Sequence, residues 1–213
     1  IPAVVFDKGA LLNGLFEEGR RAGVNYFLER NVVDARTTSE GVEIRTSAGE
    51  RFIGTFGIAA DGVNSRLARV FGLNRDRIFL HTSKAVSYYV TGVKFERSEM
   101  ICLGICYDHG GLGTIQFSML PSVYRDDEYW LYIVGPERFE YLITKSPFRS
   151  WFHNVEVTHT RCAVTSNWSP ASEPFKHNVL FVGDSCWFAE AENTGALLSG
   201  HKAANAVSYA LHT

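Results

Sequence analysis

The chain has 213 residues, of which 46% are hydrophobic and 21% are charged, and these are the values of an ordinary globular protein. One or two domains are expected at this length, with room for a sizeable buried core. The formal net charge of −2 gives no sign of a nucleic acid partner. Because no apolar run is long enough to span a membrane and no signal peptide is visible, we expect a cytoplasmic protein without a transmembrane segment.

The cysteines and histidines do not predict a metal site. Cys102, Cys106, Cys162 and Cys186 have neither the spacing of zinc ligands nor that of a redox motif. Reduced, mostly buried thiols are the expected state, which agrees with a cytosolic location. The seven histidines form no His-Glu-x-x-His or similar ligand pattern.

The first segment, residues 6–22, predicts an amphipathic helix. Asp7 is a suitable N-cap, and Gly23 can follow the C-cap and end the helix. Strands are expected next, at 25–34 and on either side of a hairpin turn at 47–50. The two strands that flank this turn are 42–46 and 51–56.

A short apolar strand at 57–60 leads into Asp61 and Gly62, and a helix is expected from Ser65 to Phe71. The strand therefore ends in a carboxylate just before a helix N-terminus, whose free N–H groups can face a phosphate. A β-turn followed by an N-cap would also place Asp, Gly, Asn and Ser here. A ligand site and a structural turn both stay open on these residues alone.

Residues 79–175 are rich in strand-forming and aromatic side chains, which favours one mostly antiparallel sheet. The expected strands are 85–95, 100–107, 113–120, 129–134 and 155–164, with a helix at 137–145. We interpret 110–113 as a hairpin turn, because no helix pattern follows it as a phosphate loop requires. Tyr107, His109 and Tyr129 are candidate contacts for an apolar or aromatic substrate, although aromatic side chains more often form plain core.

The stretch near the C-terminus has the strongest functional pattern. A buried strand at 179–182 is followed by Gly183 and Asp184, and a helix is expected to begin near residues 193–194. Asp184 can hydrogen-bond a ligand hydroxyl, and Gly183 allows the backbone to come close. The helix start at Gly195 offers N–H groups and the positive end of a dipole to an anion. An ordinary strand end with a solvated Asp explains the same residues equally well.

These two strand–turn–helix motifs, in this order, resemble the class A FAD-dependent oxidoreductase and monooxygenase family. The first reads Ala-Asp-Gly-x-x-Ser-x-x-Arg from Ala60, and the Gly-Asp pair follows about 120 residues later, before the last helix. The family includes aromatic hydroxylases, geranylgeranyl-type reductases and flavin-dependent halogenases. The likeness covers roughly residues 1–72 and 176–212.

The resemblance implies roles for five residues. In this family the Asp-Gly motif lies beside the FAD pyrophosphate, which would be the place of Asp61 and Gly62, and in hydroxylases it also serves NAD(P)H. The Gly-Asp motif holds the ribityl chain, which would be the role of Gly183 and Asp184. The helix start at Gly195 would lie by the flavin pyrimidine and favour negative charge on the reduced ring. The implied cofactor of the full-length parent is FAD, with NAD(P)H as a further reductant.

Several departures from the family pattern narrow this expectation. The Gly-x-Gly-x-x-Gly that cradles the ADP part of FAD is absent and would precede Ile1, so the chain resembles the later part of a larger flavoprotein. Ala3 stands where family members often carry Arg. The loop at 189–195 has no Pro and a single Gly, where the family usually has Pro and Gly-x-Gly. Tyr129 and Trp130 do not reproduce the Trp-x-Trp-x-Ile-Pro of flavin halogenases, which argues against halogenation.

We therefore expect an α/β (α+β) protein with two domains. Residues 1–78 and 176–213 would form a partial Rossmann-like FAD/NAD(P)-binding domain, and 79–175 a mostly antiparallel substrate domain. The expected function is FAD-dependent transfer of a hydride or oxygen to an apolar or aromatic small molecule, with the cofactor supplying the chemistry. The alternative is a non-catalytic relative that keeps the fold and binds a ligand or partner. The sequence identifies no catalytic residue and no oligomeric state.

Overall fold

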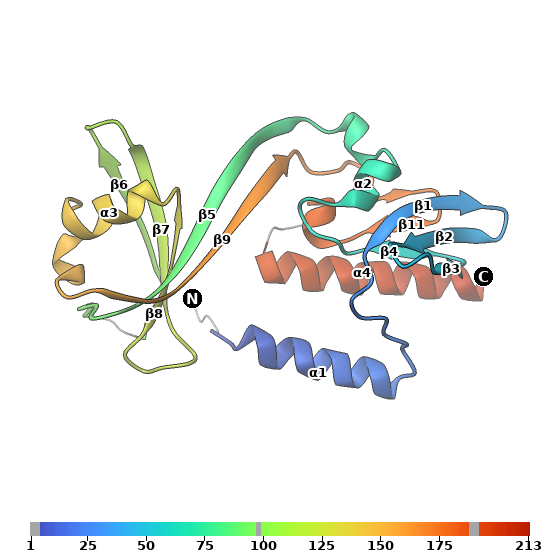
Figure 1. The fold of residues 1–213 in the computed structure, drawn as a ribbon, viewed down its shortest axis with the longest axis horizontal. Coiled ribbons are helices and arrows are strands. Elements are labelled where there is room, and N and C mark those ends of the chain that lie inside the picture. The colour runs from blue at the N-terminus through green and yellow to red at the C-terminus, as the bar shows by residue number, and fades with distance from the viewer. Residues whose placement is uncertain (1–4, 97–98, 188–191) are drawn as a thin grey trace. The chain divides into compact units, whose positions relative to one another are not determined.

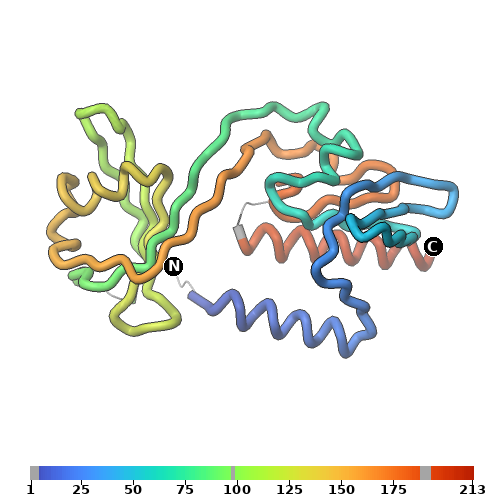
Figure 2. Tube along the Cα trace, viewed as in Figure 1, coloured from blue at the N-terminus to red at the C-terminus, as the bar shows by residue number. Residues whose placement is uncertain are grey.

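The computed structural model describes residues 5–96, 99–187 and 192–213 (Figure 1). Contacts between residues divide the chain into two compact units. Unit 1 contains Ile1–Tyr26 and Ser83–Val164, and unit 2 contains Phe27–Thr82 and Thr165–Thr213. Each unit is thus built from segments far apart in the sequence, which can be followed by colour along the trace in Figure 2.

Helix α1 (Lys8–Arg21) is capped as predicted. The Asp7 carboxylate accepts hydrogen bonds from the N–H groups of Gly9 and Ala10, at 2.7 and 3.1 Å. Gly23 follows the C-cap with φ +87°, a conformation that favours glycine. No residue of α1 is buried, so its apolar side chains remain exposed or half-exposed.

The first sheet of unit 2 is a three-stranded antiparallel meander of β1 (Val32–Thr38), β2 (Gly41–Thr46) and β3 (Arg51–Gly54). The predicted hairpin of β2 and β3 is confirmed. The predicted strand at 25–34 is wrong over most of its length, because pairing with β2 starts only at Val32. The observed strand continues through a polar stretch that the hydrophobic pattern did not reveal.

A buried carboxylate gathers three arginines on one face of this meander. Glu43 is fully buried, and Arg36, Arg45 and Arg51, one from each strand, donate to its oxygens at 2.9–3.0 Å. The hydrogen bonds from Arg36 and then Arg45 hold the pKa of Glu43 at about 2. The buried charge is tolerated because it is both paired and hydrogen-bonded.

The second sheet of unit 2 contains a parallel pair. Its strands lie in the order β10 (Phe175–Lys176), β11 (Val179–Phe181) and β4 (Gly57–Ala59), and β11 runs parallel to β4. Both short apolar strands that the sequence predicts, β4 and β11, are confirmed. Helix α2 (Arg66–Val70) follows β4, and helix α4 (Glu192–His212) follows β11 and its turn.

The hydrophobic core of unit 2 joins the two sheets. Its buried members come from β1, β2, β4, β11 and α2, and Val42 and Phe181 are among them. The 3-10 helix η1 (Leu73–Asp76) adds Leu73. Cys186 is buried in the same cluster, and none of the four cysteines, all of which lie in the described part of the chain, forms a disulfide bond.

Unit 1 is built on a five-stranded sheet with the strand order β6-β7-β8-β5-β9. The strands are β5 (Phe79–Thr91), β6 (Cys102–Asp108), β7 (Gly113–Pro121), β8 (Tyr129–Val134) and β9 (Glu156–Trp168). The pairs β6–β7, β7–β8 and β8–β5 are antiparallel, as predicted. β5 begins earlier and β9 ends later than predicted, and residues 79–82 and 165–168 of these extensions belong to unit 2.

One face of the five-stranded sheet is covered and carries the core of unit 1. α3 (Glu137–Thr144) and η2 (Arg149–Phe152) contribute the buried Leu142 and Phe152. These pack against buried strand residues, namely Val90, Cys106, Ile115, Phe117, Met119, Leu131 and Ile133. Figure 1 shows α3 in front of β6 and β7.

The two units differ from the predicted domains at their boundaries. Unit 1 includes α1, which the prediction assigned to the cofactor domain, and the Tyr124 hydroxyl donates to Asp7 at 3.3 Å within this unit. Residues 79–82 and 165–175, predicted in the substrate domain, belong to unit 2. The assignment of one domain to the cofactor and the other to the substrate stays a prediction.

Gly104 of β6 makes room for the Phe117 ring of β7. A Cβ atom on residue 104 would overlap that ring, which is fully buried and cannot move into solvent. We expect Gly104→Ala to lower the free energy of unfolding by about 1–3 kcal/mol, measured by urea denaturation. Gly14→Ala is the matched control, because a Cβ there meets nothing within 4 Å, and it should raise stability by about 0.5–1 kcal/mol. Equal changes in the two variants would contradict this packing.

Glu43 predicts a loss of stability in acid. Its pKa is lowered from 4.5 to about 2 in the fold, so its stabilising contribution is complete above pH 4.5 and disappears as the pH falls toward 2. The free energy of unfolding should therefore fall less over this range in Glu43→Gln than in the unchanged chain. Glu40→Gln removes an exposed carboxylate from the turn between β1 and β2 and serves as the control. Parallel pH profiles for Glu43→Gln and the unchanged chain would argue against the shift.

Candidate functional site

The strand ends that precede Asp61 and Asp184 lie side by side. Ala59 of β4 pairs with Phe181 of β11, and the Val182 N–H donates to the Ala59 carbonyl at 3.0 Å. Because the two strands are parallel, their carboxyl ends share one edge of the sheet. The structure therefore brings the two predicted motifs to one place, of the kind where open α/β sheets bind ligands.

Asp61 is hydrogen-bonded within its own turn. Its carboxylate accepts from the Ser65 hydroxyl at 2.6 Å and from the Leu67 N–H at 3.1 Å. Ser65 is the N-cap of α2 and accepts from the Ala68 N–H at 2.8 Å. Gly62 has φ +75°, and this turn carries the chain from the strand to the helix. Asp61 thus has the structural role in a turn that the sequence left open beside a ligand site.

A side chain of α4 holds the loop after β11. Gly183 has φ +59° and donates its N–H to Ser199 Oγ at 2.8 Å. The Ser199 hydroxyl donates to the carbonyl of Gly195, one turn earlier in α4, at 2.7 Å. Gly183 and Gly195, both predicted cofactor residues, are therefore linked through one buried hydroxyl. Ser199 was not predicted from the sequence, although a spacing of four residues places it on the same helix face as Gly195.

Asp184 lies in the 3-10 helix η3 (Gly183–Ser185) and is partly buried. The next residue, Ser185, anchors this turn to both strands. Its hydroxyl lies 2.8 Å from the Val182 carbonyl and 3.1 Å from the Ala59 carbonyl. The position of Asp184 is thus fixed by backbone and hydroxyl bonds of its neighbours.

Arg77 is a buried cation beside η3. Its guanidinium donates to the carbonyls of Ser169 and Ser185, at 2.6 and 3.2 Å, and to Asn74 Oδ1 at 2.9 Å. Burial lowers the pKa of Arg77 from its usual value. Arg77 was not predicted from the sequence, because the two carbonyls lie 92 and 108 residues away along the chain.

Trp187 is the last described residue of the loop after β11. It has φ +51°, and its backbone N–H donates to the Gly183 carbonyl at 3.0 Å. Its indole N–H is buried and has no acceptor among the described residues. A buried donor that lacks an acceptor costs free energy. An acceptor atom of a bound molecule would therefore stabilise this position.

The described part of α4 agrees with the predicted start of the last helix. It starts at Glu192, within two residues of the predicted start at 193–194. Gly195 is the fourth described residue of α4 and is buried. The part of the predicted loop motif at 189–191 lies outside the described residues.

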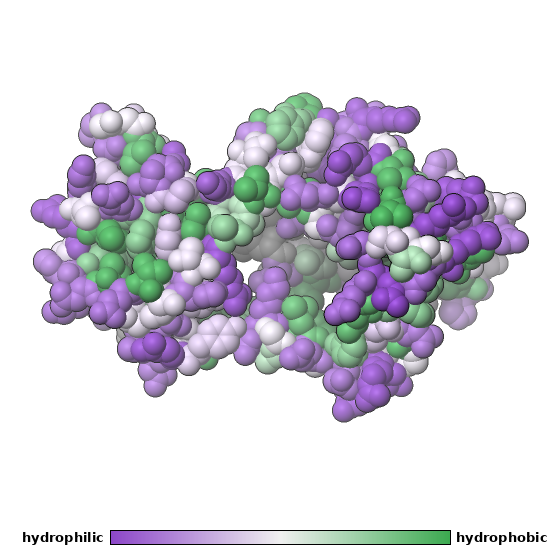
Figure 3. All heavy atoms as spheres, viewed as in Figure 1, coloured by the Kyte–Doolittle hydropathy of each residue, from purple (hydrophilic) through white to green (hydrophobic). Residues whose placement is uncertain are grey.

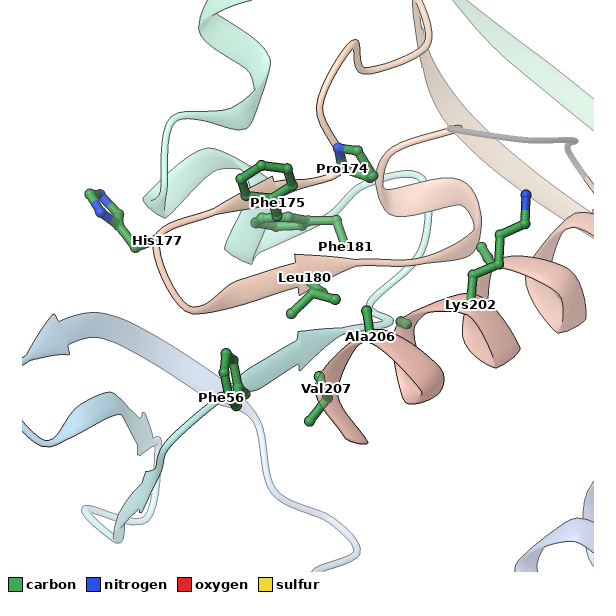
Figure 4. A pocket seen from close by; sticks show the side chains of 11 residues that line it. Phe56, Pro174, Phe175, His177, Leu180, Phe181, Lys202, Ala206 and Val207 are labelled. Atoms are coloured by element: carbon green, nitrogen blue, oxygen red, sulfur yellow. The ribbon is translucent and has the colours of Figure 1, made fainter. Parts of the chain in front are cut away.

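A pocket of about 410 Å³ lies between the β10–β11 hairpin and α4 (Figure 4). Its lining is mostly apolar, and Leu180 and Val207 face each other across it. None of the five predicted cofactor residues lines this pocket. Ser199, which borders it, is shared with the link to Gly183.

The three candidate substrate contacts have different surroundings. Tyr107 is 58% exposed on β6, and its ring lies 4.9 Å from that of His109 in the following turn. Tyr129 is 7% exposed within the core of unit 1, which favours a structural role over substrate contact. The described residues contain no group of three or more His, Cys, Asp or Glu that could hold a metal ion. No helix among them is long and apolar enough to cross a membrane.

Known proteins share this fold. No family model and no curated protein sequence matches the chain. Among solved structures, a flavoprotein/dehydrogenase from Cytophaga hutchinsonii has a TM-score of 0.66 and 17% identity over 92% of this chain. The halogenase PltM, in complex with phloroglucinol and FAD, has a TM-score of 0.65 and 12% identity over 83% of the chain. A triple mutant of the flavin-dependent brominase Bmp2 has a TM-score of 0.60 and 14% identity over 83%.

These identities are low, so the similarity establishes the fold alone. The chain has the mixed α/β fold, with antiparallel sheets, of FAD-dependent halogenases and other flavoproteins. It spans 52%, 40% and 48% of the lengths of the three structures. The predicted fold class is confirmed at this level.

The bonds of Asp61 predict an effect on stability. Asp61→Ala removes the acceptors of the Ser65 hydroxyl and the Leu67 N–H at the start of α2. We expect a loss of about 0.5–2 kcal/mol in the free energy of unfolding, as for other helix caps. Asp61→Asn keeps one acceptor oxygen and should lose less. Chemical denaturation of both variants tests this, and unchanged stability of Asp61→Ala would show that these bonds contribute nothing.

Proposed function

We propose that this chain is the later part of an FAD-dependent oxidoreductase, which transfers a hydride or oxygen to an apolar or aromatic small molecule. The parallel pairing of β4 and β11 is the observation that carries the proposal, because it places the Asp61 and Asp184 motifs at one end of a sheet. The order of these motifs resembles that of class A flavoproteins, and the fold is shared with FAD-dependent enzymes. NAD(P)H is the proposed reductant.

The residues that follow β11 fit a ligand rich in hydroxyl groups. Asp184 is a carboxylate held in a fixed turn, and a carboxylate accepts strong hydrogen bonds from hydroxyls. Gly183 has no side chain to keep the ligand away from the backbone. Trp187 adds a buried indole N–H that lacks an acceptor in the described chain. Together these groups support the ribityl chain of FAD as the occupant.

The Asp61 motif supports the proposal in a different way. The Asp61 carboxylate is engaged by Ser65 and Leu67, so we assign it a positioning role. It would hold the Gly62 backbone beside the pyrophosphate. Arg66, exposed on α2, adds positive charge on this side of the turn.

FAD, when bound, supplies the redox chemistry of such an enzyme. The residues of this chain bind and orient it. Ser199 and Arg77 keep the loop after β11 in place, because they bond to Gly183 and to the Ser185 carbonyl. Halogenation is not proposed, since Tyr129 and Trp130 depart from the halogenase pattern.

The proposal predicts that FAD affinity depends on Asp184. We expect the chain by itself to bind FAD weakly or not at all, because the phosphate-binding loop is missing. In the polypeptide that includes the upstream coding sequence, Asp184→Ala should remove roughly 1.5–3 kcal/mol of affinity. This is about tenfold to a hundredfold in dissociation constant, measured by flavin fluorescence titration.

Stability measurements separate this role from a structural one. Asp184→Ala should melt near the temperature of the unchanged protein when FAD is absent. Asp76→Ala, which removes an exposed carboxylate of the same unit, is the control and should keep the parental FAD affinity. A destabilised Asp184→Ala with parental affinity would remove the main support for the site. If the longer polypeptide binds no flavin, the alternative of a non-catalytic binding protein is favoured.

A further inference from the structure

Strand β6 is the edge of the five-stranded sheet of unit 1. It pairs with β7 over all seven of its residues, from Cys102 opposite Met119 to Asp108 opposite Gly113, without a shift in register. In the strand order of the sheet, no other strand of the described residues lies on its other side. An edge strand of this kind presents unpaired N–H and C=O groups, which can pair with a further strand.

Apolar side chains follow this edge on the uncovered face of the sheet. Leu103, Ile105 and Tyr107 are 73%, 64% and 58% exposed. The alternate residues Gly104 and Cys106 face the covered side, where the core lies. Figure 3 shows apolar side chains among the polar surface of this unit. A row of large apolar groups next to unpaired backbone groups is typical of an interaction surface.

β6 lacks the features that usually prevent an edge strand from pairing with another chain. In natural proteins these features are lysines, prolines or β-bulges on the edge strand. Residues 102–107 contain no charged residue and no proline, and the pairing with β7 shows no bulge. Asp108, at the end of the strand, is the first charge. The edge is therefore suited to pairing with an uncharged strand.

We propose that β6 pairs antiparallel with β6 of a second copy of this chain, with the two-fold axis at Ile105. In this register Ile105 lies opposite the partner's Ile105, and Leu103 lies opposite the partner's Tyr107. The two five-stranded sheets then form one continuous sheet. The apolar row of one copy lies beside the same row of the other, on the same face of this sheet, and a two-fold axis relates the two rows.

Self-complementarity favours a second copy over another partner. Every exposed apolar side chain of the strand meets an apolar side chain in this register. Asp108 lies opposite the partner's Cys102, so no like charges are directly opposed. The net charge of −2 adds little repulsion between copies. A second copy therefore supplies the matching apolar strand, and a partner of another sequence is not needed.

A charge placed on the axis tests the proposal. Ile105→Lys would bring two ammonium groups face to face, so the dimer seen by analytical ultracentrifugation of the full chain should become monomeric. Gln116→Lys is the matched control, because it adds the same charge on the same face, opposite Ile105 on β7 and about one strand spacing of 4.8 Å further in. This variant should remain dimeric. Circular dichroism should show the same fold for all three proteins.

Cross-linking tests the register. Oxidation of Ile105→Cys should join two chains, because the introduced thiols meet at the axis, whereas Gln116→Cys should not exceed the background of the unchanged chain. That background is needed because Cys162 is exposed. A monomeric unchanged chain would overturn the proposal, as would a dimer that Ile105→Lys leaves intact. A monomer that binds a foreign strand at β6 would assign the edge to another protein.

Discussion

The parallel pairing of β4 with β11 is the contact on which unit 2 depends. The two strands have three residues each and are separated by about 120 residues, so closing this loop costs chain entropy. Burial of Ala59, Val179 and Phe181 in the core opposes that cost. The Ala59 carbonyl also accepts from both the Val182 N–H and the Ser185 hydroxyl, which joins the ends of the two strands at one atom. The part of the chain between β4 and β11, which includes β5 to β9, must fold in a way that allows these two strands to pair.

Local features of the fold were predictable because their causes lie within a few residues. Asp7 caps α1 through N–H groups two and three residues away. The hairpin of β2 and β3 follows from its alternating pattern and short turn. The region at 25–34 is one where local patterns did not predict the strand correctly. Its true strand, from Val32 to Thr38, is polar and exists because β2 lies beside it, which is a tertiary effect that no short window contains.

The meeting of the two Asp-containing turns was predictable from the sequence, whereas most of the hydrogen bonds that hold these turns were not. The two Asp-containing turns were expected to meet, and the paired strands bring their ends together. The bonds that Ser199 and Arg77 make to Gly183 and Ser185 were missed, since they join segments distant in the sequence. The buried indole N–H of Trp187 is likewise visible only once the chain is folded. The sequence patterns thus indicate which turns meet, while the residues that support these turns depend on long-range packing.

Both aspartates follow a short apolar strand, and their surroundings differ. Asp61 supports its own turn, because its carboxylate bonds to Ser65 and to the Leu67 N–H. The turn that contains Asp184 has other supports, since Ser185 ties it to both strands and Ser199 holds the Gly183 N–H.

This difference between the two turns affects what a substitution at each aspartate would cost. A side chain on which its own turn depends is constrained first by folding, because its replacement costs stability directly. A side chain whose turn is also held by bonds of its neighbours can be replaced with a smaller loss of stability. In the proposed flavin site, replacement of Asp184 should therefore disturb the strand pairing of unit 2 less than replacement of Asp61, because the turn after β11 keeps the bonds of Ser185 and Ser199.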